Sequence, residues 1–122
     1  MTGAADFRRI ALSLPEAEED LHRSRPAFRV RRKIFAMLGV AGNTSFFVGL
    51  DRGEVAVVKL DRDDQLNLIA AHGEALAPTE AYGHHGWTYL YLSTADEVLL
   101  SLVLRLAWTH VVPKSLSKQL SG

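Results

Sequence analysis

A basic segment contains the side chains whose types and spacing most suggest chemistry. Within residues 23–33 there are six fixed positive charges and no acid: Arg23, Arg25, Arg29, Arg31, Arg32 and Lys33. Outward-facing cations at this density favour contact with phosphates, because such contacts gain free energy largely through counterion release. The alternative interpretation is a solvated strand face whose arginines pair with the acids of residues 16–20. Lys114 and Lys118, near the C-terminus, are secondary candidates for phosphate contact.

Three aromatic side chains form a stripe on a predicted strand. Trp87, Tyr89 and Tyr91 occupy alternate positions within residues 87–92, and alternate side chains of a strand point to the same face of the sheet. On an open face these rings could stack on bases or form a dimer interface. Under a covering segment they would instead belong to the core. The sequence leaves these three roles open.

Neither a metal site nor a catalytic centre is predicted. The chain has no cysteine, which excludes disulfides and thiolate chemistry. His84 and His85 are adjacent, so their side chains point in different directions, which does not favour their binding one metal ion together. The sequence has no phosphate-loop, nucleophile-elbow or paired-carboxylate motif. We therefore expect a protein that is not an enzyme and that needs no cofactor.

Apolar residues at helical spacing predict three helices. They are residues 6–14, a segment opened by Asp61, and residues 98–112. Asp61 is expected to cap the second helix, and Thr94 with Glu97 is expected to form a capping box at the start of the third. The third helix is apolar except for a narrow polar stripe, so either the fold wraps it or a second subunit partly covers it.

Alternating apolar residues predict strands in the rest of the chain. The strand patterns cover residues 27–30, 34–38, 45–50, 54–60 and 87–92. Pro78 allows at most an edge strand over 75–82. Arg32–Lys33 is the expected turn between the first two strands, and Asp51–Gly53 has the clearest hairpin signal. The acids of residues 16–20 are expected in a solvated loop.

Length and composition favour one globular domain over residues 1–122, with a polar tail from about residue 114. Hydrophobic residues make up 48% and charged residues 23%, so neither a disordered nor a membrane class fits. No apolar run is long enough to span a bilayer, and the N-terminus does not have the layout of a signal peptide. We therefore expect a cytoplasmic protein. The net charge of +0 excludes no partner, because acidic and basic segments are separated along the chain.

Short stretches spread over most of the chain carry a family resemblance. They are Ser13–Glu19, Phe28–Val30, Lys33–Ala36, Val57–Leu60, Gly83–Leu92, Ala107–Trp108 and Pro113–Leu116. In order and spacing they resemble the MmcQ/YjbR family of small bacterial proteins. The resemblance implies a two-layer α+β fold with helices over an antiparallel sheet. Together with the patterns above, we expect a sheet of about five strands with helices packed on one face, in the order α-β-β-β-α-β-β-α. It also implies DNA binding through a paired-wing arrangement.

One departure from the family concerns the predicted site. The family often has glycines in the turn before the Lys33–Ala36 stretch, where this chain has Arg31–Arg32. We predict a DNA-binding protein of the MmcQ/YjbR type that contacts phosphates through the basic strand and turn. Nothing resembles a base-reading helix, so low sequence specificity is expected. The alternative is a non-enzymatic interaction module that forms a homodimer through the last helix or the aromatic stripe.

Overall fold

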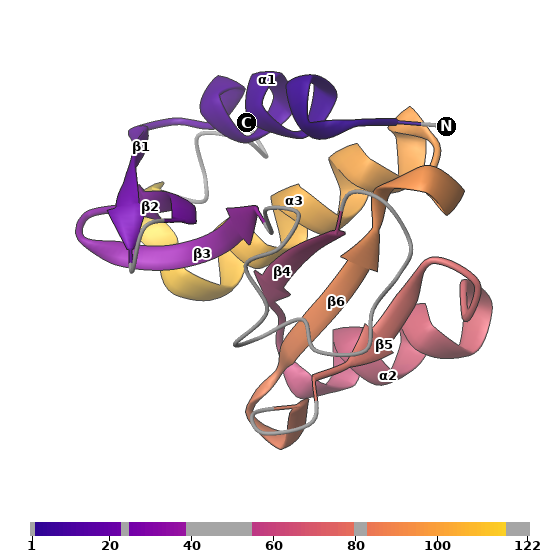
Figure 1. Ribbon diagram of the computed structural model, residues 1–122. Helices are drawn as coiled ribbons and strands as arrows, with labels where there is room; N and C mark the ends of the chain where they lie inside the picture. Colours follow the sequence, from indigo (N-terminus) through magenta and orange to yellow (C-terminus); the bar gives the residue numbers. More distant parts are fainter. Residues whose placement is uncertain (1, 23–24, 39–54, 80–82, 117–122) are drawn as a thin grey trace.

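The computed structural model describes residues 2–22, 25–38, 55–79 and 83–116 (Figure 1). Its helices and strands follow in the chain as α1 (Ala4–Ser13), β1 (Ala17–His22), β2 (Arg25–Val30), β3 (Lys33–Leu38), β4 (Val55–Lys59), α2 (Arg62–Ala71), β5 (Leu76–Pro78), β6 (Trp87–Tyr91) and α3 (Glu97–Val111). Two short 3-10 turns, η1 (Gly83–His85) and η2 (Leu92–Thr94), flank β6. The predicted strand at 45–50 and the predicted hairpin turn at 51–53 lie outside the described residues.

The described strands form one antiparallel sheet in the order β1-β2-β3-β4-β6-β5. The helices lie on one side of this sheet (Figure 1), which confirms the predicted α+β class. β5 is an edge strand that ends at Pro78, as expected for a residue without a backbone N–H. Within the described residues the sheet has six strands, where about five were predicted.

The additional strand is β1, where a solvated loop was predicted. β1 pairs with β2 from Ala17 opposite Val30 to His22 opposite Arg25. β1 is an outer strand with an acidic sequence, so it lacks the apolar alternation that is typical of a strand. Its Leu21 is 71% exposed. Charged side chains on such an edge also discourage pairing with other chains. The expected loop is therefore wrong for residues 17–20, whereas Glu16 lies in the turn before β1.

The core lies between the sheet and the helices α1 and α3. Phe7 of α1 packs against Phe28 of β2 in an edge-to-face arrangement, with ring centroids 5.5 Å apart. The largest buried side chains of α3 share one face of that helix: Leu100, Leu104 and Trp108. Packing on β3, β4 and α1 explains the apolar residues on the buried face of α3, whereas Val98 and Leu102 of this helix are exposed. No described helix is long and apolar enough to cross a membrane.

Side-chain caps determine where α2 and α3 begin. Asp61 accepts a backbone N–H of the first turn of α2 at 3.1 Å, which confirms the predicted cap. At α3 the cap is Asp96, which accepts a first-turn N–H at 2.8 Å, so the predicted capping box of Thr94 and Glu97 is wrong. Thr94 belongs to η2, and its hydroxyl donates to the carbonyl oxygen of Glu74 at 2.7 Å. That hydrogen bond ties η2 to the turn after α2.

A buried amide joins α2 to the η1–β6 segment. Gln65 is fully buried, and its Nε2 donates to the carbonyl oxygen of Gly83 at 2.9 Å and to Thr88 Oγ1 at 3.0 Å. The Thr88 hydroxyl donates in turn to the carbonyl oxygen of Gly86 at 3.0 Å. Each of these buried groups has a partner, so the network fixes α2 on the sheet without leaving polar atoms unsatisfied.

Candidate functional site: a strained basic turn beside an acidic edge strand

A two-residue turn of Arg31 and Arg32 joins β2 to β3. Val30 and Lys33 face each other across it, and the two arginines have φ angles of 49° and 72°. Turns with two positive φ angles match the twist of a hairpin and usually contain Asn–Gly. The turn therefore lies one residue earlier than the expected Arg32–Lys33, and Lys33 begins β3. Arg31, Arg32 and Lys33 are called the basic turn below.

The backbone of the basic turn is strained at its two arginines. A left-handed conformation costs a residue with a Cβ about 1–2 kcal/mol, and glycine would adopt it without this cost. The surrounding hairpin holds the turn in place, since Arg29 Nη1 donates to the carbonyl oxygen of Arg32 at 3.0 Å. Strained positions of this kind cluster at functional sites, where the surrounding structure holds them in place.

Glu16 holds the Arg31 side chain. Arg31 Nε donates to Glu16 Oε1 at 3.0 Å, and Nη2 donates to Oε2 at 3.1 Å, which is the two-pronged geometry of the stronger arginine–carboxylate pairs. This hydrogen bonding holds the pKa of the Glu16 carboxyl below its ordinary value. Trp108 of α3 anchors the same corner, because its Nε1 donates to the carbonyl oxygen of Pro15 at 2.9 Å.

The acidic edge strand also neutralises the outer part of β2. Arg29 Nε lies 3.0 Å from Asp20 Oδ2, and Glu18 is directly opposite Arg29 in the strand register. Glu19 accepts a hydrogen bond from Arg8 of α1 at 2.9 Å. For Arg29 and Arg31 the structure therefore matches the alternative interpretation of the basic segment, in which the arginines pair with the preceding acids.

Arg32 and Lys33 differ from the other two cations of this hairpin. Both side chains are exposed, and within the described parts of the chain no carboxylate forms an ion pair with either of them. The hairpin thus gathers four of the predicted phosphate contacts, of which Arg29 and Arg31 are paired. The available positive charge is concentrated at Arg32 and Lys33.

The remaining predicted contacts are spread along the chain. Arg25 is the first residue of β2, and Lys114 follows the end of α3. Arg23 and Lys118 lie outside the described residues. Within the basic segment of residues 23–33, the candidate site therefore consists of Arg29 and the basic turn.

The aromatic stripe is covered in the structure. Tyr89 and Tyr91 are 2% and 5% exposed and cluster with two valines of β4. Trp87 is partly buried, and Lys59 Nζ lies 5.3 Å from its ring centroid. Burial lowers the pKa of Lys59 at this position. Of the three roles left open by the sequence, the covered sheet face is the one that fits Tyr89 and Tyr91, because stacking or dimer contacts need accessible rings.

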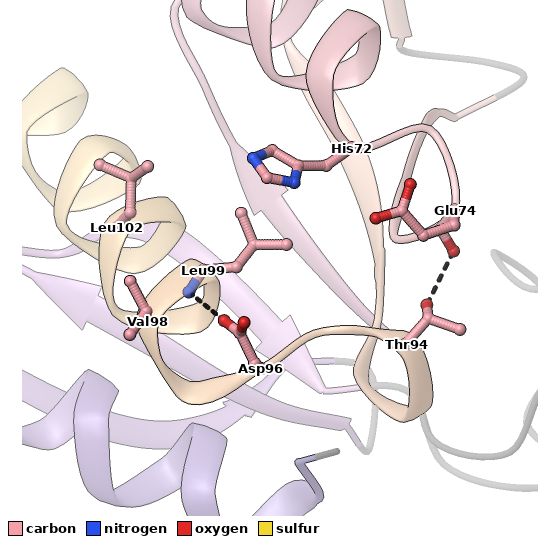
Figure 2. A pocket seen from close by; sticks show the side chains of 7 residues that line it. All are labelled: His72, Glu74, Thr94, Asp96, Val98, Leu99 and Leu102. Atoms are coloured by element: carbon pink, nitrogen blue, oxygen red, sulfur yellow. Dashed lines mark hydrogen bonds between the residues drawn. The ribbon is translucent and has the colours of Figure 1, made fainter.

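A pocket of about 180 Å³ lies between the end of α2, the turn before β5 and the first turns of α3 (Figure 2). Its lining consists of His72, Glu74, Thr94, Asp96, Val98, Leu99 and Leu102. Sequence patterns do not reveal this pocket, because its residues come from separate segments that only the fold brings together. Among the residues that the structure describes, no three histidine or acidic side chains gather to hold a metal ion.

A solved structure shares this fold, and a family model matches most of the sequence. The crystal structure of Deinococcus radiodurans protein DR2400, which has a DUF419 domain, matches with a TM-score of 0.73. The match covers 99% of this chain and 89% of that chain at 20% identity, so it shows the fold. No curated protein matches the sequence. Residues 12–110 match the family described as YjbR. The chain therefore belongs to the YjbR family.

Proposed function

We propose that this YjbR-family protein binds DNA through the basic turn, by contacting phosphates and without catalysing a reaction. The observation that carries the proposal is the left-handed backbone of Arg31 and Arg32, at positions where asparagine or glycine would be less strained. Guanidinium groups match the geometry of phosphate oxygens, and contacts to phosphate carry little sequence information. Low sequence specificity follows.

The ion pairs with Asp20 and Glu16 limit how many cations of the hairpin can contact DNA phosphates. Arg32 and Lys33 reach phosphate without losing an ion pair to a described residue, whereas Arg29 and Arg31 must first leave Asp20 and Glu16. Each phosphate contact changes the slope of log K against log salt by about −0.9. We therefore expect a slope of about −2, against the value of about −7 that all eight predicted cations would produce.

Fluorescence anisotropy of a short labelled duplex, titrated with protein at about 50 and 200 mM salt, tests this proposal. The double variant Arg32→Gln with Lys33→Gln removes the two exposed charges of the turn. Its affinity at the lower salt concentration should fall about tenfold or more, because two phosphate contacts are lost. The magnitude of its salt slope should fall by about 2.

A matched variant separates the basic turn from general attraction to DNA. Arg9→Gln with Arg105→Gln removes the same charge from exposed positions on α1 and α3, and its affinity should change by no more than about twofold. Equal losses in the two double variants would mean that the turn is not the site. An absence of saturable binding at the lower salt concentration would overturn DNA binding altogether.

A further inference from the structure

The pocket beside α3 has an apolar floor and wall. The lining residue Leu99 is 7% exposed, whereas Val98 and Leu102 are 79% and 43% exposed. These three side chains come from one stretch of α3, and Figure 2 shows His72 across the pocket from them. Val98 is the most exposed large hydrophobic side chain of the described chain. This wall can accept the hydrocarbon part of a ligand.

The remaining lining contains two carboxylates beside the imidazole of His72 and the hydroxyl of Thr94. Glu74 and Asp96 both contribute to the pocket, and no cation among the described residues forms an ion pair with either carboxylate. Asp96 Oδ1 accepts the N–H of Leu99 at 2.8 Å, which leaves its second oxygen for another donor. The hydrogen bond from Thr94 to the Glu74 carbonyl holds the two acid-bearing segments together, as Figure 2 shows.

We propose that this pocket binds an aliphatic ammonium group. The hydrocarbon chain packs on Val98, Leu99 and Leu102, and the ammonium lies by the carboxylates of Glu74 and Asp96. The volume of about 180 Å³ is below the ~300–1,000 Å³ of pockets for drug-sized ligands, so a group the size of a lysine side chain suits it. This site is separate from the basic turn and does not depend on DNA binding.

Amide NMR spectra of the full chain, recorded while n-butylamine hydrochloride is added, test the proposal. The backbone signals of Thr94, Leu99 and Leu102 should shift and saturate together. Butyrate and n-butanol contain the same number of carbon atoms as the amine, with a negative charge or none. Each should bind about fivefold more weakly than the amine, because an exposed ion pair contributes up to about that factor.

The double variant Glu74→Gln with Asp96→Asn removes the two charges and keeps their shapes. Asparagine caps a helix about as well as aspartate, so α3 should be retained, and unchanged signals outside the pocket check this. Affinity for butylamine should fall about fivefold or more, while the affinity for butanol stays the same. Equal binding of butylamine, butanol and butyrate would overturn the proposal, and so would an absence of saturable shifts with the amine.

A lysine side chain and a free amine carry the same chemistry, and a second ligand distinguishes them. N-acetyl-lysine amide presents the side chain with a peptide backbone on each side. Tighter binding of this compound than of butylamine would identify the ligand as a lysine of a partner protein. Tighter binding of butylamine would identify a free small amine. Either result supports an ammonium site.

Discussion

Arg31 and Glu16 form a two-pronged ion pair across the end of the sheet, with nitrogen–oxygen distances of 3.0 and 3.1 Å, and both residues have positive φ angles. The carboxylate occupies the place on the guanidinium that a phosphate would take. The same acid therefore stabilises the folded hairpin and competes with an anionic ligand. The predictions for Glu16→Gln and for the pH dependence of stability follow from this opposition.

Replacing Arg32 by glycine should stabilise the protein and weaken its binding to DNA. Arg32 is exposed and has a φ of 72°, so glycine relieves about 1–2 kcal/mol of backbone strain. The greater freedom of glycine in the unfolded chain offsets about 0.5–1 kcal/mol of this gain. Urea denaturation should show a net increase of about 0.5–1 kcal/mol in the free energy of unfolding, and anisotropy should show weaker binding.

Arg32→Lys is the matched control, because lysine keeps both the charge and the strain. Its stability should stay within about 0.5 kcal/mol of the unmodified protein, and DNA affinity should be largely retained. A glycine variant that is less stable than the lysine variant would show that the left-handed backbone at this position is not strained.

Glu16→Gln should strengthen DNA binding by releasing Arg31 from its ion pair. One additional phosphate contact makes the slope of log K against log salt steeper by about 0.9. The control Glu18→Gln removes the same charge two residues away. Glu18 lies opposite Arg29 in the strand register and forms no ion pair with Arg31. Anisotropy should therefore show a steeper slope for the first variant and an unchanged slope for the second. An identical gain in both would assign the effect to net charge.

The Arg31–Glu16 pair should also make stability depend on pH in the acidic range. The hydrogen bond from Arg31 lowers the pKa of Glu16 in the folded protein. A carboxyl whose folded pKa is depressed stabilises the protein above its unfolded pKa, and this contribution is lost as the pH falls through the folded pKa. Arg31→Gln should return the pKa of Glu16 toward its ordinary value, as followed by carboxyl NMR. An unchanged Glu16 pKa in this variant would mean that the pair does not persist in solution.

Much of the fold was predictable because buried faces impose a period on the sequence. Phe7, Ile10 and Ala11 lie on the buried face of α1, and Leu100, Leu104 and Trp108 lie on the buried face of α3. The strand β1 had no such signal, because an acidic edge strand buries little. Arg31–Arg32 also lacks the asparagine and glycine that mark a two-residue turn, so the predicted turn was displaced by one residue.

The functional surfaces were less predictable than the elements. The sequence identified the basic segment, but whether its arginines pair with acids depended on β1 lying beside β2. In α2 the structure leaves Leu66 50% exposed and buries Gln65, although apolar side chains are the ones expected on the buried face of a helix. A buried glutamine depends on hydrogen-bond partners from another segment, such as Thr88, and a local sequence pattern does not reveal these partners.

Replacing Gln65 by leucine should therefore destabilise the protein although it makes the helix more apolar. The Nε2 donor lost in this variant serves the Gly83 carbonyl and Thr88 Oγ1, and unsatisfied buried groups cost about 1–3 kcal/mol. Asn67→Leu makes a comparable change at an exposed position of the same helix and should alter stability by less than about 0.5 kcal/mol. Urea denaturation of both variants measures the difference, and equal stabilities would contradict a structural role for the amide.

Gly86 should tolerate no side chain, because the backbone of Leu60 lies where a Cβ would be. A Cβ at Gly86 would lie 1.9 Å from the Leu60 carbonyl oxygen, and the residue has a φ of 93°. Gly86→Ala should therefore cost about 3 kcal/mol or more, since the contact is with backbone and cannot be relieved by a rotamer change. At Gly73 the nearest atom would be 3.4 Å away, so Gly73→Ala should change stability by less than about 0.5 kcal/mol. Thermal unfolding of the two alanine variants measures this difference. Similar midpoints would show that the segment that begins β6 moves readily away from Leu60.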